Sequence, residues 1–173
     1  SEVTVYTANR ELMTEMLTTM LKKGIDPTAI EPDIVCLARF IEKSKSLSSP
    51  KDRITVITGE KACYLIMPSD GHNQPFVRSF LITPSQNLTD TLAREIAITV
   101  ASFSSQEPVT SIAVAGKAEN IDTEKLAEKT GMDVSAIELL DETDANVGDA
   151  AESVFAIAYG AALAELTRTT KTD

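Results

Sequence analysis

The sequence predicts an α/β fold in two parts, a small βαβα segment over residues 1–45 and a larger βββαβαβα lobe over residues 46–173. Three observations lead to this prediction. Three strand-like runs follow one another closely between residues 53 and 83, and such short connections indicate antiparallel neighbours. Helix-like and strand-like runs then alternate, as they do in parallel crossover units. The polar run SKSLSSPKD, at 44–52, separates the two parts.

The first part begins with a strand-like run, EVTVYTA, at residues 2–8. Asn9 is a suitable N-cap for the helix that follows, and Gly24 supplies its C-cap. The run DPTAIEP, at 26–32, is predicted to be a short strand or an extended link, and a second helix starts at Asp33. The apolar residues of the first helix recur at helical spacing and form one stripe: Leu12, Met13, Met16, Leu17, Met20 and Leu21.

The second part contains the elements of the larger lobe. Strands are predicted at 53–58, 62–67, 74–83, 110–116 and 132–140, and helices begin at 87, 122 and 149. Asn87 and Asp122 are N-caps, and Gly131 ends the helix that Asp122 begins. The last helix is rich in Ala, and such small residues favour close packing on a neighbour. This order of elements is typical of the ribonuclease H-like sheet, the half-unit of the actin, Hsp70 and hexokinase folds.

Composition restricts the classes of function. The formal charge is −10, from 26 acidic and 16 basic residues, which disfavours binding to nucleic acid or to anionic lipid head groups. There is no signal peptide and no apolar run of about 18 residues that could span a membrane. Cys36 and Cys63 have no metal-binding spacing and are expected to be buried, reduced thiols, which fits a cytosolic setting.

Four stretches, in this order, resemble the type IV pilus assembly protein PilM family. They are TANRELMTEMLTTMLKKGIDPTAIEPDIVCLARFIE, FVRSFLITPSQNLTDTLAREI, VTSIAVAGKAENIDTEKLAEKTGMDVSAIEL and FAIAYGAALAEL. The cytoplasmic domain of the type II secretion protein L shares this architecture. The resemblance implies an actin-like ATPase fold. It also implies that the chain is a fragment, with the end of an inserted small domain at 1–45, the second large lobe at 46–173, and the first phosphate loop upstream of Ser1.

The resemblance also directs attention to the hairpin ITVITGEKACYLIM, at 54–67. In this superfamily such a hairpin usually carries Asp-x-Gly, in which the carboxylate holds a metal and the glycine admits a phosphate. Gly59 is present here, but Ile57 stands where the acid is expected. Glu60 and Lys61 follow in the turn; Lys61 could meet a phosphate, although a solvated turn lysine is the commoner case.

A second nucleotide element, a glycine-rich turn after the fourth strand, is reduced to Gly116 followed by Lys117. No catalytic, cofactor-binding or metal-binding residue is therefore predicted in this chain. No cofactor is expected for the fragment, while ATP stays open for the full-length protein.

Other candidate sites have simpler explanations. His72, beside Asp70, lies in a predicted hairpin turn and would be solvent-exposed. One His and one Asp are too few ligands for a metal. The acidic run 141–149 lacks the spacing of an EF-hand loop, so a solvated loop, or a contact for a basic partner, explains it better. The sequon NLT at Asn87 is explained by helix capping.

These observations favour a non-enzymatic scaffold. The resemblance implies that it links a cytoplasmic motor ATPase to inner-membrane assembly proteins of a pilus or secretion machine, in the cytoplasm and peripheral to the inner membrane. The alternatives are a nucleotide-binding actin-like ATPase whose first phosphate loop lies upstream, and a small-molecule kinase of the same fold.

Overall fold

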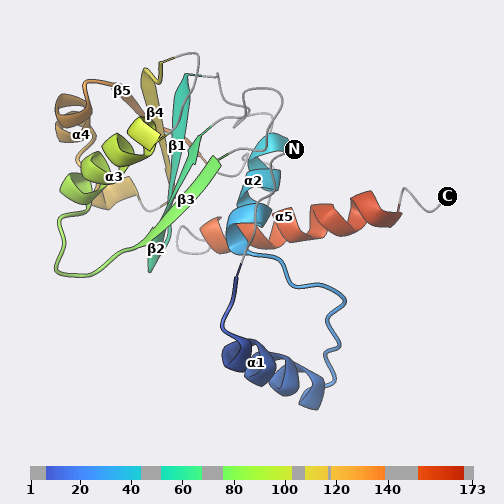
Figure 1. Ribbon diagram of the computed structural model, residues 1–173. Coiled ribbons are helices and arrows are strands. Elements are labelled where there is room, and N and C mark those ends of the chain that lie inside the picture. The colour runs from blue at the N-terminus through green and yellow to red at the C-terminus, as the bar shows by residue number, and fades with distance from the viewer. Residues whose placement is uncertain are drawn as a thin grey trace. The chain divides into compact units, whose positions relative to one another are not determined.

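The residues that the structure describes form a mixed sheet of five strands in the order β3-β2-β1-β4-β5 (Figure 1). The structure is a computed structural model, and it describes residues 7–43, 52–67, 76–102, 108–116, 118–138 and 152–169. Antiparallel pairing joins β1 to β2 and β2 to β3, whereas β4 pairs in parallel with β1 and β5 with β4. The strands are β1 (Arg53–Thr58), β2 (Ala62–Met67), β3 (Phe76–Leu81), β4 (Ser111–Gly116) and β5 (Asp133–Ala136). The predicted ribonuclease H-like order is confirmed.

Helices cover both faces of the sheet, so the central strands are buried on both sides. On one face lie α3 (Leu88–Ser102) and α4 (Thr123–Thr130); on the other lie α2 (Asp33–Lys43) and α5 (Glu152–Thr169) (Figure 1). Because successive side chains of β1 point to opposite faces of the sheet, Ile54 and Val56 belong to one core cluster and Ile57 belongs to the other. The first cluster also contains Leu65, Met67, Leu92, Ile96, Ile112, Val114 and Leu126, and the second contains Leu37, Phe40, Ile41, Tyr64, Ile66, Ala115 and Ala156.

α2 and α5 cross closely at a glycine. A Cβ on Gly160 would lie 2.0 Å from the backbone oxygen of Cys36, so only glycine allows this approach. The Arg39 guanidinium donates a hydrogen bond to the Gly160 carbonyl oxygen at 2.7 Å. The predicted close packing of the Ala-rich helix on a neighbour is confirmed.

The first compact unit, Ser1–Pro32, contains α1 (Arg10–Lys22). The Asn9 side chain caps it by accepting from the backbone N–H groups of Glu11 and Leu12 at 2.9 and 3.1 Å. Gly24 has φ +77°, and the next residue, Ile25, donates to the backbone oxygen of Met20 at 3.0 Å. Both predicted caps are confirmed. No strand forms at 25–32, so the extended link is found; residues 2–6 of the predicted first strand lie outside the described residues.

The second compact unit, Asp33–Asp173, begins earlier than the predicted boundary after residue 45. The reason is α2, whose apolar side chains Leu37, Phe40 and Ile41 belong to the core cluster beneath α5. Most of the polar run that suggested the boundary, 44–51, lies outside the described residues. The assignment of the first segment to an inserted small domain stays a prediction.

The caps of α3 and α4 agree with the sequence. Asn87 Oδ1 accepts from the backbone N–H of Asp90 at 3.1 Å, and Asp122 Oδ1 accepts from that of Lys125 at 3.0 Å. Gly131 ends α4 with φ +68°. β5 is shorter than predicted, since it ends at Ala136. Among the helices in the described part of the chain, none has the length and apolar character needed to cross a membrane.

Candidate functional site at the turn between β1 and β2

The turn between β1 and β2 lies where the parallel strands β1 and β4 both end. Gly59 donates its backbone N–H to the Ala62 carbonyl at 2.9 Å, and Ile82 donates to the Lys61 carbonyl at 2.9 Å. Thr58 pairs with Gly116, which places the end of β4 beside the turn. The structure therefore brings together the turn residues and the glycine that the sequence singled out in two separate segments.

Ile57 is a core residue and not a residue of the turn surface. It is fully buried, and its neighbours across the sheet are Tyr64 of β2 and Ala115 of β4. All three belong to the core cluster under α2 and α5. A metal-binding carboxylate at this position would point into an apolar core, where an unpaired charge is strongly disfavoured.

Gly116 is needed for strand packing. Its φ is +81°, and a Cβ there would lie 2.3 Å from the backbone oxygen of Thr58. Thr58 also joins the two strands, because its hydroxyl donates to the Ala115 carbonyl oxygen at 2.9 Å. The contact between β1 and β4 explains this glycine without a bound ligand. Lys117, which follows it, lies outside the described residues.

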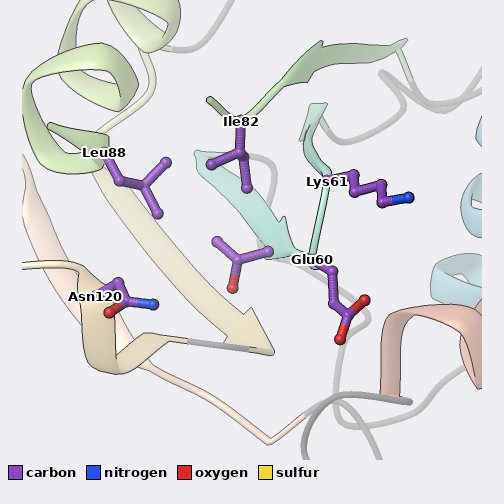
Figure 2. Close-up of a pocket in the computed structure, with 7 residues that line it drawn as sticks. Glu60, Lys61, Ile82, Leu88 and Asn120 are labelled. Carbon is purple, nitrogen blue, oxygen red and sulfur yellow. The ribbon is translucent and has the colours of Figure 1, made fainter. Parts of the chain in front are cut away.

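A pocket of about 380 Å³ opens beside the turn, on the α3 side of the sheet. This volume is within the range of about 300–1,000 Å³ for small-molecule sites. Its lining consists of Thr58, Gly59, Glu60, Lys61, Ile82, Leu88 and Asn120. Figure 2 shows Ile82 and Leu88 beside the open space, whereas the Lys61 side chain extends away from Leu88 and Asn120.

This lining does not fit a metal-bound phosphate group. It contains one acidic and one basic side chain, Glu60 and Lys61, so there is no excess of positive charge. The Glu60 carboxylate would repel a phosphate, and the neighbouring position where a metal ligand is expected is the buried Ile57. No group of His, Cys, Asp and Glu that could hold a metal ion occurs among the residues described.

A second pocket, of about 310 Å³, lies on the opposite side of the turn. Gly59, Glu60, Lys61, Ala62, Tyr64, Val154 and Ile157 line it. The Tyr64 hydroxyl donates a hydrogen bond to Asp33 Oδ2 at 2.7 Å. Burial, followed by this hydrogen bond, raises the pKa of Tyr64 above its ordinary value. This contact ties the start of α2 to β2.

The remaining sequence candidates are placed as follows. Cys36 and Cys63 are free and buried, as expected, and burial raises the pKa of the Cys63 thiol to about 12. His72 and Asp70 lie outside the described residues, and so does the acidic run 141–149.

Sequence reasoning did not identify four residues of the first pocket: Thr58, Ile82, Leu88 and Asn120. Strand alternation carried a signal for Thr58, since it must face the side opposite to Ile57. The other three come from separate segments, and their meeting depends on the tertiary fold.

Comparison with known proteins finds likeness in structure. No protein-family model matches the sequence, and no curated protein matches it either. A solved structure of the PilM–PilN type IV pilus biogenesis complex is similar, with a TM-score of 0.60 and 15% identity over 90% of this chain and 58% of that chain. The ethanolamine utilization protein EutJ from Carboxydothermus hydrogenoformans is also similar, with a TM-score of 0.50 and 11% identity over 88% of this chain and 61% of that chain.

The fold is that of the actin-like ATPases. The resemblance to PilM is thereby confirmed at the level of the fold. At these identities the likeness establishes the fold and not the activity. The chain spans about three fifths of the length of each similar protein.

Proposed function

We propose that this chain is part of a non-enzymatic scaffold in the inner-membrane platform of a type IV pilus or type II secretion machine. The observation that carries the proposal is Ile57, a fully buried core residue where an active relative would need a carboxylate. The pocket beside it has no net positive charge for phosphates. The hairpin keeps its shape because its core is intact, while the chemistry for nucleotide hydrolysis is missing from it.

The proposed partners are an inner-membrane assembly protein and a cytoplasmic motor ATPase. The first is supported by a similar structure, in which PilM is complexed with PilN. The motor ATPase is inferred from the scaffold role alone. In this proposal the protein is cytoplasmic and peripheral to the inner membrane.

A nucleotide-binding member of the same fold is the second candidate, because a pocket of suitable size does lie at the turn. Isothermal titration of the full-length protein with Mg-ATP separates the two. The scaffold proposal predicts no binding at micromolar concentrations. Micromolar binding that Lys61→Ala weakens would reject the proposal and assign the nucleotide to this turn.

The partners are tested by co-purification of the full-length protein from membranes. A tagged protein should retain an inner-membrane assembly protein after detergent extraction, and a secretion or pilus ATPase should be enriched with it. Recovery of neither partner would contradict the scaffold role, whatever the result with Mg-ATP.

A further inference from the structure

The two edges of the sheet differ in how they are protected against pairing with another strand. β5 is a short edge of four residues that begins with the charged Asp133. β3, at the opposite edge, has six residues and contains neither Pro nor Lys. Its one charged residue, Arg78, is held by Glu95 at 2.6 Å. Soluble proteins usually protect long edge strands with Pro, charged side chains (especially Lys), bulges or a covering segment.

The backbone of β3 offers hydrogen-bonding groups toward this edge. The N–H of Ile82 donates to the carbonyl of Lys61, in line with the antiparallel register between β2 and β3. Because the backbone groups of successive residues point to opposite sides, those of Arg78 and Phe80 also face β2. Those of Val77, Ser79 and Leu81 therefore face away from the sheet.

Neither a strand nor a side chain in the described part of the chain pairs with these outward groups. In Figure 1, β3 forms the margin of the sheet, and β2 is its strand neighbour. Beside them, the Leu81 side chain is 74% exposed, the highest value among the exposed large apolar residues that the structure describes. An unpaired backbone edge next to an exposed leucine is the surface that an added strand would cover.

We propose that a second copy of this chain pairs with β3 through an antiparallel two-fold contact centred on Ser79. In this register Ser79 faces Ser79 of the second copy, and Val77 faces Leu81 of the second copy. The outward N–H and C=O groups of both strands then bond to each other, and the two sheets become one continuous sheet.

The side chains of β3 are complementary to themselves in this register. Leu81 is covered by Val77 of the second copy, so the most exposed leucine gains an apolar neighbour. On the other face Arg78 lies opposite Phe80 of the second copy, so no like charges face each other directly. This match between residues of the same strand favours a second copy over an unrelated extended segment.

A single pair of six-residue strands buries less surface than a permanent dimer, so the contact is expected to be weak and concentration-dependent. Sedimentation velocity of the 173-residue chain over a range of concentrations should therefore show a monomer–dimer equilibrium. Leu81→Lys should raise the dissociation constant about tenfold or more, because it places a charge on the edge. Ala136→Lys, at the exposed end of β5, adds the same charge to the other edge and should leave the equilibrium unchanged.

Cross-linking tests the register directly. Facing residues in a hydrogen-bonded antiparallel pair have Cα atoms about 5.5 Å apart, which is within the range of a disulfide. Ser79→Cys should form an intermolecular disulfide under mild oxidation, whereas Ser102→Cys, exposed at the end of α3, should not. The native cysteines are buried and do not compete.

Two outcomes would overturn the proposal. A chain that stays monomeric at high concentration would exclude a second copy and leave the edge for an extended segment of another protein. A dimer that withstands Leu81→Lys and gives no Ser79 cross-link would show that self-association uses another surface.

Discussion

The substitution Ile57→Asp tests whether position 57 is a core position or a metal position that has lost its ligand. If the site were only missing its carboxylate, restoring Asp would leave the fold intact and allow Mg-nucleotide to bind. The structure predicts the opposite result. Ile57 is fully buried between Tyr64 and Ala115, so the new carboxyl group would enter an apolar core.

The magnitude follows from two contributions. Losing the burial of one isoleucine costs about 1.5–3 kcal/mol. Keeping an aspartic acid protonated at neutral pH, about three units above its ordinary pKa, costs about 4 kcal/mol more. The sum of about 6 kcal/mol is comparable with the total stability of a domain, about 5–15 kcal/mol. The variant should therefore be largely unfolded at neutral pH or retain only a small part of its stability.

The pH dependence gives the sharper assay. Burial raises the folded-state pKa of the new carboxyl group above its unfolded value, so the variant should be more stable at low pH and lose stability as the pH rises. Between about pH 5.5 and pH 7.5 the difference is about 2.7 kcal/mol. Urea unfolding followed by circular dichroism at both pH values measures it. Ile57→Asn introduces a side chain similar in size to Asp but with no titrating group. Any change of the unfolding free energy with pH that Ile57→Asp shows beyond that of Ile57→Asn therefore belongs to the carboxyl group.

One further control and one refuting outcome complete the test. Ile57→Val removes one methylene group and should cost about 1 kcal/mol at either pH. An Ile57→Asp variant as stable as the natural chain, with measurable binding of Mg-nucleotide, would refute the reasoning and make the position a degraded metal site.

Three further predictions concern packing and charge. Gly160→Ala should lower the free energy of unfolding, measured in urea, by about 1–3 kcal/mol, because overpacking against α2 outweighs a helix-propensity gain of about 1 kcal/mol. A more stable variant would contradict the close crossing of α2 and α5. Gly116→Ala should lower the thermal stability more than Gly131→Ala does, since both glycines have positive φ but only at Gly116 would a Cβ meet a backbone atom within 4 Å. Equal losses of thermal stability would show that φ alone matters. The hydrogen bond from Lys125 lowers the folded-state pKa of Asp90, so the stability that this ion pair contributes is present above the unfolded pKa and is lost as the pH falls. Asp90→Asn should therefore make urea unfolding less sensitive to acid, and an unchanged response to acid would argue against the ion pair.

The sequence was sufficient to place most elements, because their signals are local. Helix caps such as Asn9 and Asp122 and the alternation of β1 depend on neighbouring residues only. That α2 belongs to the second compact unit could not be predicted from neighbouring residues. α2 packs on α5, where Gly160 is distant from α2 in the sequence and close to it in space. The polar run after α2 suggested a boundary that the packing places before Asp33.

The same distinction limits what could be predicted of the candidate site. The sequence showed Ile57 at the position where the resemblance leads us to expect an acid. Only the structure showed that this side chain is buried in the core. Leu88 and Asn120 reach the pocket from separate segments, so no local pattern connects them to the turn. A motif can show that a ligand is missing, whereas the structure shows what occupies its place.

Gly116, which ends β4 beside the hairpin, leads to a different conclusion from the missing acid at position 57. A glycine at the end of a strand is easily taken as the remnant of a phosphate site. Gly116, however, is held by the backbone of Thr58 at a distance that excludes any Cβ, and this contact belongs to the strand pair itself. A chain that binds no nucleotide would keep this glycine for the same reason. Ile57 is therefore more informative about nucleotide binding than Gly116 is. Strand packing would keep Gly116 with or without a ligand, whereas the apolar core around Ile57 disfavours a carboxylate.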